Sequence, residues 1–98
     1  MMAVELTTFK LNNCTLAQFI EANQEIDVFL RHQKGFLSRN MFELGGIIYD
    51  LLFWNSEAEG RAAMHKLMID LSDSMVHDMI DQPTVSWNIT TVKHFVNS

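Results

Sequence analysis

Four short segments of the chain are rich in β-branched and apolar residues, and they predict β-strands at residues 4–11, 36–44, 47–54 and 84–96. Two longer segments between them carry apolar residues at helical spacing. They predict one helix from the cap Thr15 to Gly35 and another from the cap Ser56 to Asp81. The second helix carries poor interior residues at 72–74, which mark a kink or a break.

This order of elements, βαββαβ, predicts an α+β fold of the ferredoxin-like type. In that fold a four-stranded antiparallel sheet carries both helices on one face. Gly45 and Gly46 supply the positive φ angles of a tight hairpin between the second and third strands. We expect a single domain over residues 1–98.

The third strand, residues 47–54, is apolar on both faces. We assign Tyr49, Leu51 and Phe53 to the helix side. Alternation then places the remaining apolar residues on the face away from the helices: Ile48, Leu52 and Trp54. On the second strand, Phe36, Phe42 and Leu44 are expected to share one face. Because monomers rarely expose large apolar patches, we expect a homodimer through the sheet faces.

Composition narrows the class of protein. The chain has 98 residues, a net charge of −5 and only seven scattered Lys and Arg residues, which argues against a nucleic-acid partner. Its apolar runs are shorter than the ~18 residues of a membrane span, so we expect no membrane insertion. With one cysteine and no basic, apolar leader pattern, we expect a cytoplasmic protein.

Asp50 is the first candidate for chemistry, because alternation puts its carboxylate among Ile48, Leu52 and Trp54. Desolvation there would favour a general base. The alternative is a structural carboxylate that bonds Arg39 or a backbone amide and anchors the dimer.

Other candidates each have a functional and a structural interpretation. Trp54 and Trp87 are either ligand platforms or packing wedges, and His65 is either an acid/base group or a core or interface histidine. Asp73, His77 and Asp81 form a stripe better explained as a solvated face than as a metal site, so we expect no metal. Cys14 precedes a helix but has no base beside it.

The joint Asp50-x-x-x-Trp54-x-Ser56-x-x-x-x-x-Ala62, preceded by Gly35-Phe36-x-Ser38-Arg39, resembles the antibiotic biosynthesis monooxygenase-like superfamily of dimeric α+β barrels. The resemblance implies a homodimer with two sheets face to face, a pocket beside each sheet, and in some members cofactor-free oxidation of aromatic substrates or haem degradation. Aligned at this joint, the catalytic Trp and His of haem-degrading members fall near Ala63 and Asp73, which cannot replace them.

Two functions follow as hypotheses. In the first, a small apolar or aromatic molecule binds in a sheet-side cavity, where the chain has a cofactor-free monooxygenase-like activity. Asp50 and His65 are then the catalytic candidates, and the ligand-binding candidates are Ile48, Leu52, Trp54 and Trp87. In the second, the chain is a non-catalytic interaction dimer that binds nothing.

Overall fold

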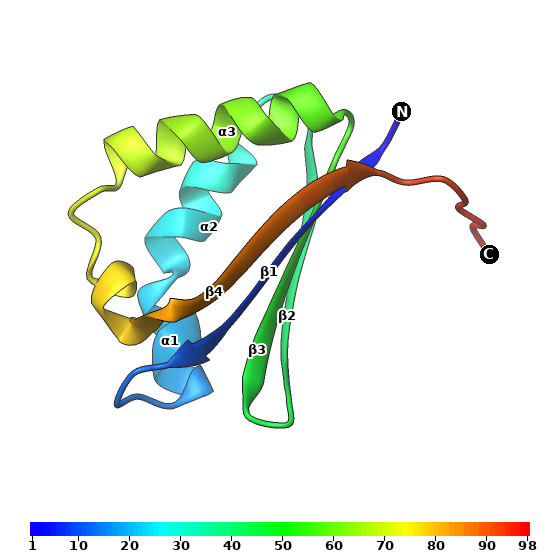
Figure 1. Cartoon of the computed structure of the whole chain (residues 1–98). Helices are drawn as coiled ribbons and strands as arrows, with labels where there is room; N and C mark the ends of the chain where they lie inside the picture. Colours follow the sequence, from blue (N-terminus) through cyan, green and yellow to red (C-terminus); the bar gives the residue numbers. More distant parts are fainter.

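The computed structural model describes all residues, 1–98, and has one four-stranded antiparallel sheet with helices on one side of it (Figure 1). The strand order is β2-β3-β1-β4, which is the predicted ferredoxin-like arrangement. The elements are β1 Ala3–Leu11, α1 Leu16–Ala22, α2 Gln24–Arg31, β2 Phe36–Leu44, β3 Ile47–Trp54, α3 Glu57–Asp70, the 3-10 helix η1 Met75–Met79 and β4 Ile80–Thr91. None of the helices combines the length and the apolar character that a membrane span requires.

The first helical segment begins as predicted but is divided in two by Asn23. The capping box between Thr15 and Gln18 is present, with both reciprocal bonds formed. Asn23 is 2% exposed, and its side-chain Nδ2 donates to the carbonyl of Phe19 at 2.8 Å. An asparagine that bonds a carbonyl four residues back competes with the backbone ladder, which explains the break at this point.

The β2–β3 hairpin turns at Gly45 and Gly46, whose φ angles of +61° and +78° confirm the prediction. The predicted common face on β2 is confirmed for Phe42 and Leu44, which pair with Tyr49 and Ile47, and is wrong for Phe36. The pairing shifts between Phe36 and Ser38, and this irregularity turns Phe36 toward the helices while Phe42 stays on the opposite face. Phe36 accordingly packs edge-on against Trp54, with ring centroids 5.4 Å apart.

The second helical segment ends earlier than the sequence predicted. Regular helix stops at Asp70, and Ser74 caps η1 by accepting a bond from the Val76 amide at 3.3 Å. The break after Asp70 therefore includes the poor interior residues 72–74, as the sequence indicated. Strand β4 begins at Ile80 rather than at residue 84, because the end of β1 is still available to pair with it.

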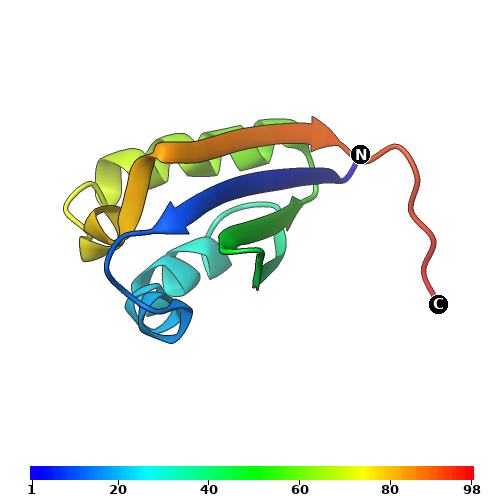
Figure 2. The same cartoon turned by 60° about the horizontal axis from the view of Figure 1, so that its bottom comes forward.

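Pro83 lies inside β4 instead of preceding it. The β1–β4 pairing is irregular after Thr8, and there the Lys10 amide donates to the Thr84 hydroxyl at 2.8 Å instead of to a backbone carbonyl. A proline is tolerated in such a bulge on an edge strand. At its other end β4 stops at Thr91, opposite Ala3, so the predicted extension to residue 96 is wrong (Figure 2).

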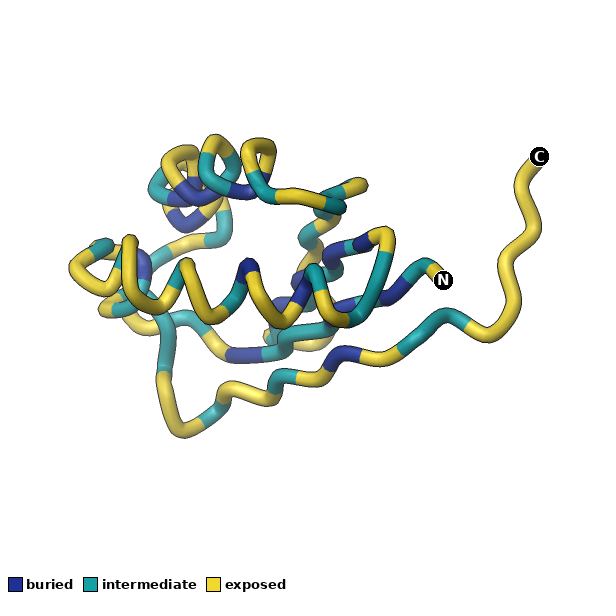
Figure 3. The backbone as a smooth tube through the Cα atoms, turned by 90° about the horizontal axis from the view of Figure 1, so that it is seen from above, coloured by how far each residue is buried: buried dark blue, intermediate teal, exposed yellow.

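The Val92 amide still donates to the Met2 carbonyl at 2.8 Å, and residues 93–98 then run away from the body of the molecule. Figure 3 shows this segment as mostly exposed, and Phe95 and Val96 are 66% and 77% exposed.

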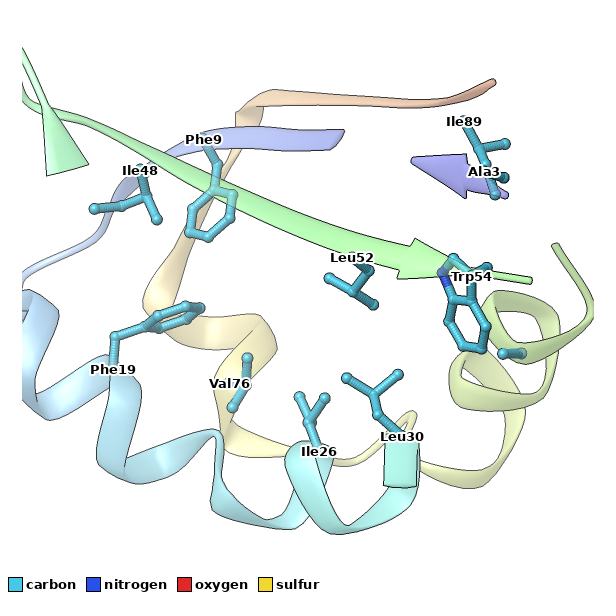
Figure 4. Packing of buried hydrophobic residues seen from close by; sticks show 11 residues of the cluster. Ala3, Phe9, Phe19, Ile26, Leu30, Ile48, Leu52, Trp54, Val76 and Ile89 are labelled. Atoms are coloured by element: carbon cyan, nitrogen blue, oxygen red, sulfur yellow. The ribbon is translucent and has the colours of Figure 1, made fainter. Parts of the chain in front are cut away.

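The face assignment of β3 is reversed in the structure. Ile48, Leu52 and Trp54 are 0%, 6% and 1% exposed and pack in the core with side chains of the helices (Figure 4). The helical partners are Phe19, Ile26, Leu30, Ala63 and Val76. Tyr49, Leu51 and Phe53 therefore lie on the open face of the sheet.

Candidate functional site

A cavity of about 280 Å³ lies between the helix-covered face of the sheet and the helices. Fourteen of its 21 lining residues are hydrophobic. Its outer part includes Met68 of α3 and Val85 of β4, which are 56% and 40% exposed, whereas its inner part includes the buried Glu5, Asp50 and Leu52. The cavity thus leads from an opening between α3 and β4 to a polar inner end.

Glu5 of β1 is the most unusual side chain of this inner end, since it is 1% exposed. Its Oε1 accepts a hydrogen bond from the Trp54 indole Nε1 at 2.8 Å, and its Oε2 accepts one from the Trp87 Nε1 at 2.7 Å. Burial raises the pKa of Glu5, and the hydrogen bonds from the two indoles partly oppose this rise. The negative charge of Asp50 raises the pKa further, by more than the positive charge of Arg39 lowers it.

Arg39 of β2 is the centre of a second polar cluster beside the cavity. Its guanidinium donates twice to Asp50, from Nε at 3.0 Å and from Nη2 at 2.8 Å. It also donates to the Asn23 Oδ1 at 2.9 Å and to the Asp27 Oδ1 at 2.8 Å. Burial alone would lower the pKa of Arg39, but the bonds and charges of Asp50 and Asp27 raise it above its ordinary value.

The two tryptophans are held from several sides. Trp87 lies under the guanidinium of Arg61, which is 5.7 Å from its ring centroid. Trp54 packs against Gly60 of α3, where a Cβ atom would come within 2.9 Å of the indole Cδ1. Because Gly60 has no side chain, α3 can approach β3 this closely.

A second hollow of about 410 Å³ lies outside this cavity and is more polar. Arg39 and Asn23 line both, so their side chains separate the two spaces. The other residues of the hollow are Ile20, Asp27, Arg31, Phe36 and Met41. We take the smaller cavity as the candidate site because it is largely apolar and contains a buried acid without a cationic partner.

The structure brings most of the predicted ligand-binding residues together. Leu52, Trp54 and Trp87 line the cavity, while Ile48 is fully buried in the core and is not part of the lining. Asp50 lines the cavity and forms an ion pair with Arg39, which was one of the two interpretations of this residue in the sequence. It does so on the helix side, so this ion pair does not lie on the open face. A catalytic role for Asp50 stays a prediction.

His65 does not lie in a buried apolar surface of α3. The structure exposes it, and it is not among the residues that line the cavity. The reason is that α3 turns Gly60 and Ala63 to the sheet, which places position 65 on the outer side. The catalytic role predicted for His65 has no support from this position.

The structure contains no group of three or more His, Cys, Asp or Glu residues that could hold a metal ion. The stripe of Asp73, His77 and Asp81 is not helical, because these positions fall in the break, in η1 and in β4. The Cys14 thiol lies 3.7 Å from the Met79 carbonyl oxygen.

Sequence reasoning missed Glu5, Asn23 and the methionines of α3 as site residues. Glu5 shares its strand face with Thr7 and Phe9, so a lone acid on an otherwise apolar or neutral face was the available signal. Asn23 gave no such signal, because a polar residue between two helical stretches usually faces water.

No protein-family model and no curated protein sequence matches this chain. Solved structures do match it. SnoaB, a cofactor-independent oxygenase from Streptomyces nogalater, aligns with a TM-score of 0.77 and 12% identity, over 99% of this chain and 98% of that one.

Two further structures give the same picture. A protein from Nitrosomonas europaea proposed to be an antibiotic biosynthesis monooxygenase has a TM-score of 0.72 and 11% identity, over 95% of this chain and 91% of its own. A proposed monooxygenase from Shewanella loihica PV-4 has a TM-score of 0.70 and 19% identity, over 96% of both chains. The chain therefore has the fold of the antibiotic biosynthesis monooxygenase-like proteins, as the resemblance in its sequence predicted.

Proposed function

We propose that this chain forms a homodimer that binds a small aromatic molecule in the cavity between its sheet and its helices. We further propose that it oxidises this molecule without a cofactor, in the manner named for the structurally similar SnoaB. The observation that carries the proposal is the largely apolar cavity with the buried Glu5 carboxylate at its inner end. Apolar walls with a few convergent polar groups are typical of small-molecule sites.

The size of the cavity supports a ligand of about two fused rings. A dry apolar cavity of roughly 150 Å³ accepts benzene, so about 280 Å³ leaves room for a second ring. Met64 and Met68 of α3 line this space, and their unbranched side chains adapt to irregular ligands.

The proposed homodimer forms through the open face of the sheet, which is apolar. Val4 and Leu6 of β1 pair there with Phe53 and Leu51 of β3. The apolar surface continues to the stacked rings of Phe42 and Tyr49, whose centroids are 5.1 Å apart, and to Leu44, which is 65% exposed. A second copy of the same face would cover both surfaces by two-fold symmetry.

Ligand binding is tested by thermal unfolding with naphthalene, 2-naphthol and 2-tetralone, and oxidation by oxygen uptake with those that bind. We expect a rise in Tm, because a ligand at about 100 times its Kd adds about 2.7 kcal/mol of stability. Leu67→Trp should fill the cavity and remove the shift. Ile69→Trp, on the exposed side of the same helix, is the matched control and should keep it.

The alternative function is a non-catalytic interaction dimer. One observation favours it: every buried side-chain nitrogen and oxygen already has a hydrogen-bond partner without a ligand. If none of the three compounds changes Tm in the wild-type protein, the ligand-binding proposal is wrong and the interaction dimer is supported.

A further inference from the structure

Glu5 is a buried carboxylate without an ion-pair partner. The ion pairs of the chain join Arg39 to Asp27 and Asp50, and Arg61 to Glu57, so no Lys or Arg neutralises Glu5 directly. Its two hydrogen bonds come from neutral indoles. A buried charge held only by neutral donors is costly, which makes this position a candidate for function rather than for stability alone.

The carboxylate retains acceptor capacity toward the cavity. Two carboxylate oxygens offer about four lone-pair sites, and the indoles of Trp54 and Trp87 occupy two of them. Glu5 lines the cavity together with both tryptophans. The indoles fix the position of the carboxylate, since they approach from β3 and β4 on either side of β1.

We propose that Glu5 is the proton acceptor of this cavity, and that its substrates are two-ring aromatic compounds with an acidic O–H or an acidic C–H beside a carbonyl. This inference rests on the proposed function, because it needs a ligand in the same cavity. In the step, the O–H or C–H bond of the ligand breaks and its electron pair stays on the ligand as a phenolate or enolate. The proton forms an O–H bond on Glu5 and exchanges there with solvent, and the reverse step returns a solvent-derived hydrogen to the ligand.

Glu5 is better suited to this step than Asp50, the other acid of the cavity. Both oxygens of Asp50 accept bonds from the Arg39 guanidinium, so proton uptake there would break a buried ion pair. Glu5 loses no ion pair when it is protonated. Burial, which raises the pKa of Glu5, also brings its basicity closer to that needed near neutral pH.

The test uses exchange of hydrogen for deuterium at the carbon between the ring and the carbonyl of 2-tetralone, in D2O under argon, followed by NMR. No oxidant takes part in it. We expect the wild-type protein to accelerate exchange by roughly 100-fold or more over buffer. Glu5→Gln should remove the acceleration while 2-tetralone still raises its Tm. Glu43→Gln, which removes an exposed acid on β2, should exchange at the wild-type rate.

A second variant keeps Glu5 and changes its environment. Trp87→Phe removes one indole donor, and because that bond lowers the pKa of Glu5, its loss should raise the pKa. The pH at which exchange reaches half its maximum should therefore move upward. The other charged or titratable groups that line the cavity are Arg39, Asp50 and His77, with Asp27 behind Arg39. All of them are unchanged in this variant.

The outcomes separate this inference from the proposed function. Binding of 2-tetralone by the wild-type protein without accelerated exchange would overturn the role of Glu5 and leave the ligand site standing. Exchange that persists in Glu5→Gln, or an unshifted pH profile in Trp87→Phe, would assign the proton to another group such as His77 and would also overturn it. Absence of binding by the wild-type protein would overturn both proposals.

Discussion

Glu5 on β1 and Trp87 on β4 are joined by a hydrogen bond of 2.7 Å between the carboxylate Oε2 and the indole Nε1, although 82 positions separate them in the sequence. The same carboxylate accepts a bond from Trp54 on β3. Three neighbouring strands therefore meet at one buried acid. This arrangement leads to the first prediction, which concerns stability as a function of pH.

The contribution of Glu5 to the stability of the protein should decrease as pH rises above the ordinary glutamate pKa of 4.5. Burial raises the pKa of Glu5 in the folded chain, so the folded state binds its proton more tightly than the unfolded state. The stabilising contribution is complete below the unfolded pKa and is lost as pH rises through the folded pKa. Glu57 behaves oppositely, since Arg61 lowers its pKa and its contribution is lost only below pH 4.5.

Urea unfolding of the wild type and Glu5→Gln between pH 4.5 and 8 measures this effect. The free energy of unfolding of the wild type should fall relative to that of the variant as pH rises. The difference between the two profiles cancels the histidines, which titrate in both proteins. Parallel profiles would contradict the raised pKa of Glu5.

Arg39→Met should destabilise the protein by about 3 kcal/mol or more, because it leaves Asp50 buried without its cation. Asp27→Asn is the control. Asp27 accepts one bond from the same guanidinium, but its side chain is 39% exposed and solvent screens the pair, so we expect a loss of about 1 kcal/mol or less. Equal losses in urea unfolding would show that the Asp50 end of the network is not the more important one.

Leu51→Lys should convert the proposed dimer into a folded monomer, because Leu51 lies on the open face of the sheet. Leu52→Lys, one residue later, should prevent folding, since Leu52 is 6% exposed in the core. Val28→Lys changes an exposed residue of α2 and should leave the mass unchanged. Light scattering measures the mass, and circular dichroism reports folding. A folded Leu51→Lys protein with the wild-type dimer mass would rule out this interface.

Gly60→Ala should destabilise the protein, although alanine favours a helix by about 1 kcal/mol. The added Cβ would come within 2.5 Å of Ile89 Cδ1 and 2.9 Å of Trp54 Cδ1. Overpacking of this kind costs roughly 1–3 kcal/mol.

Ile89→Val removes the closer of these two atoms and provides the matched test. The double variant Gly60→Ala/Ile89→Val should lose less stability than the sum of the two single losses in urea unfolding. Strict additivity would mean that α3 does not approach β4 as closely as described.

The sequence determined the elements and their order. The Thr15 cap and the Gly45-Gly46 turn are local signals that produced the predicted structure, whereas alternating and helical spacing gave the type of each element but not all of its bounds. Their order was enough for the ferredoxin-like sheet, since short connections leave few topologies open. The poor interior residues at 72–74 also indicated the end of α3, but nothing in the sequence indicated that β4 begins as early as Ile80.

Tertiary structure decided which face of the sheet the helices cover. Alternation separates Tyr49, Leu51 and Phe53 from Ile48, Leu52 and Trp54, but both sets are apolar, so the pattern is symmetric with respect to the two faces. The core broke this symmetry by packing Trp54 against Gly60 and Phe36.

The candidate site also depends on which face of the sheet the helices cover. With Trp54 on the helix side, the register of β1 brings Glu5 opposite Leu52, and that of β4 brings Trp87 opposite Thr7. Local spacing could mark Glu5 as a lone acid on its strand face, but the two indoles beside it depend on the long-range pairing of β1 with β3 and β4. Sequence thus specified the strands of this protein, while their register and packing specified its cavity.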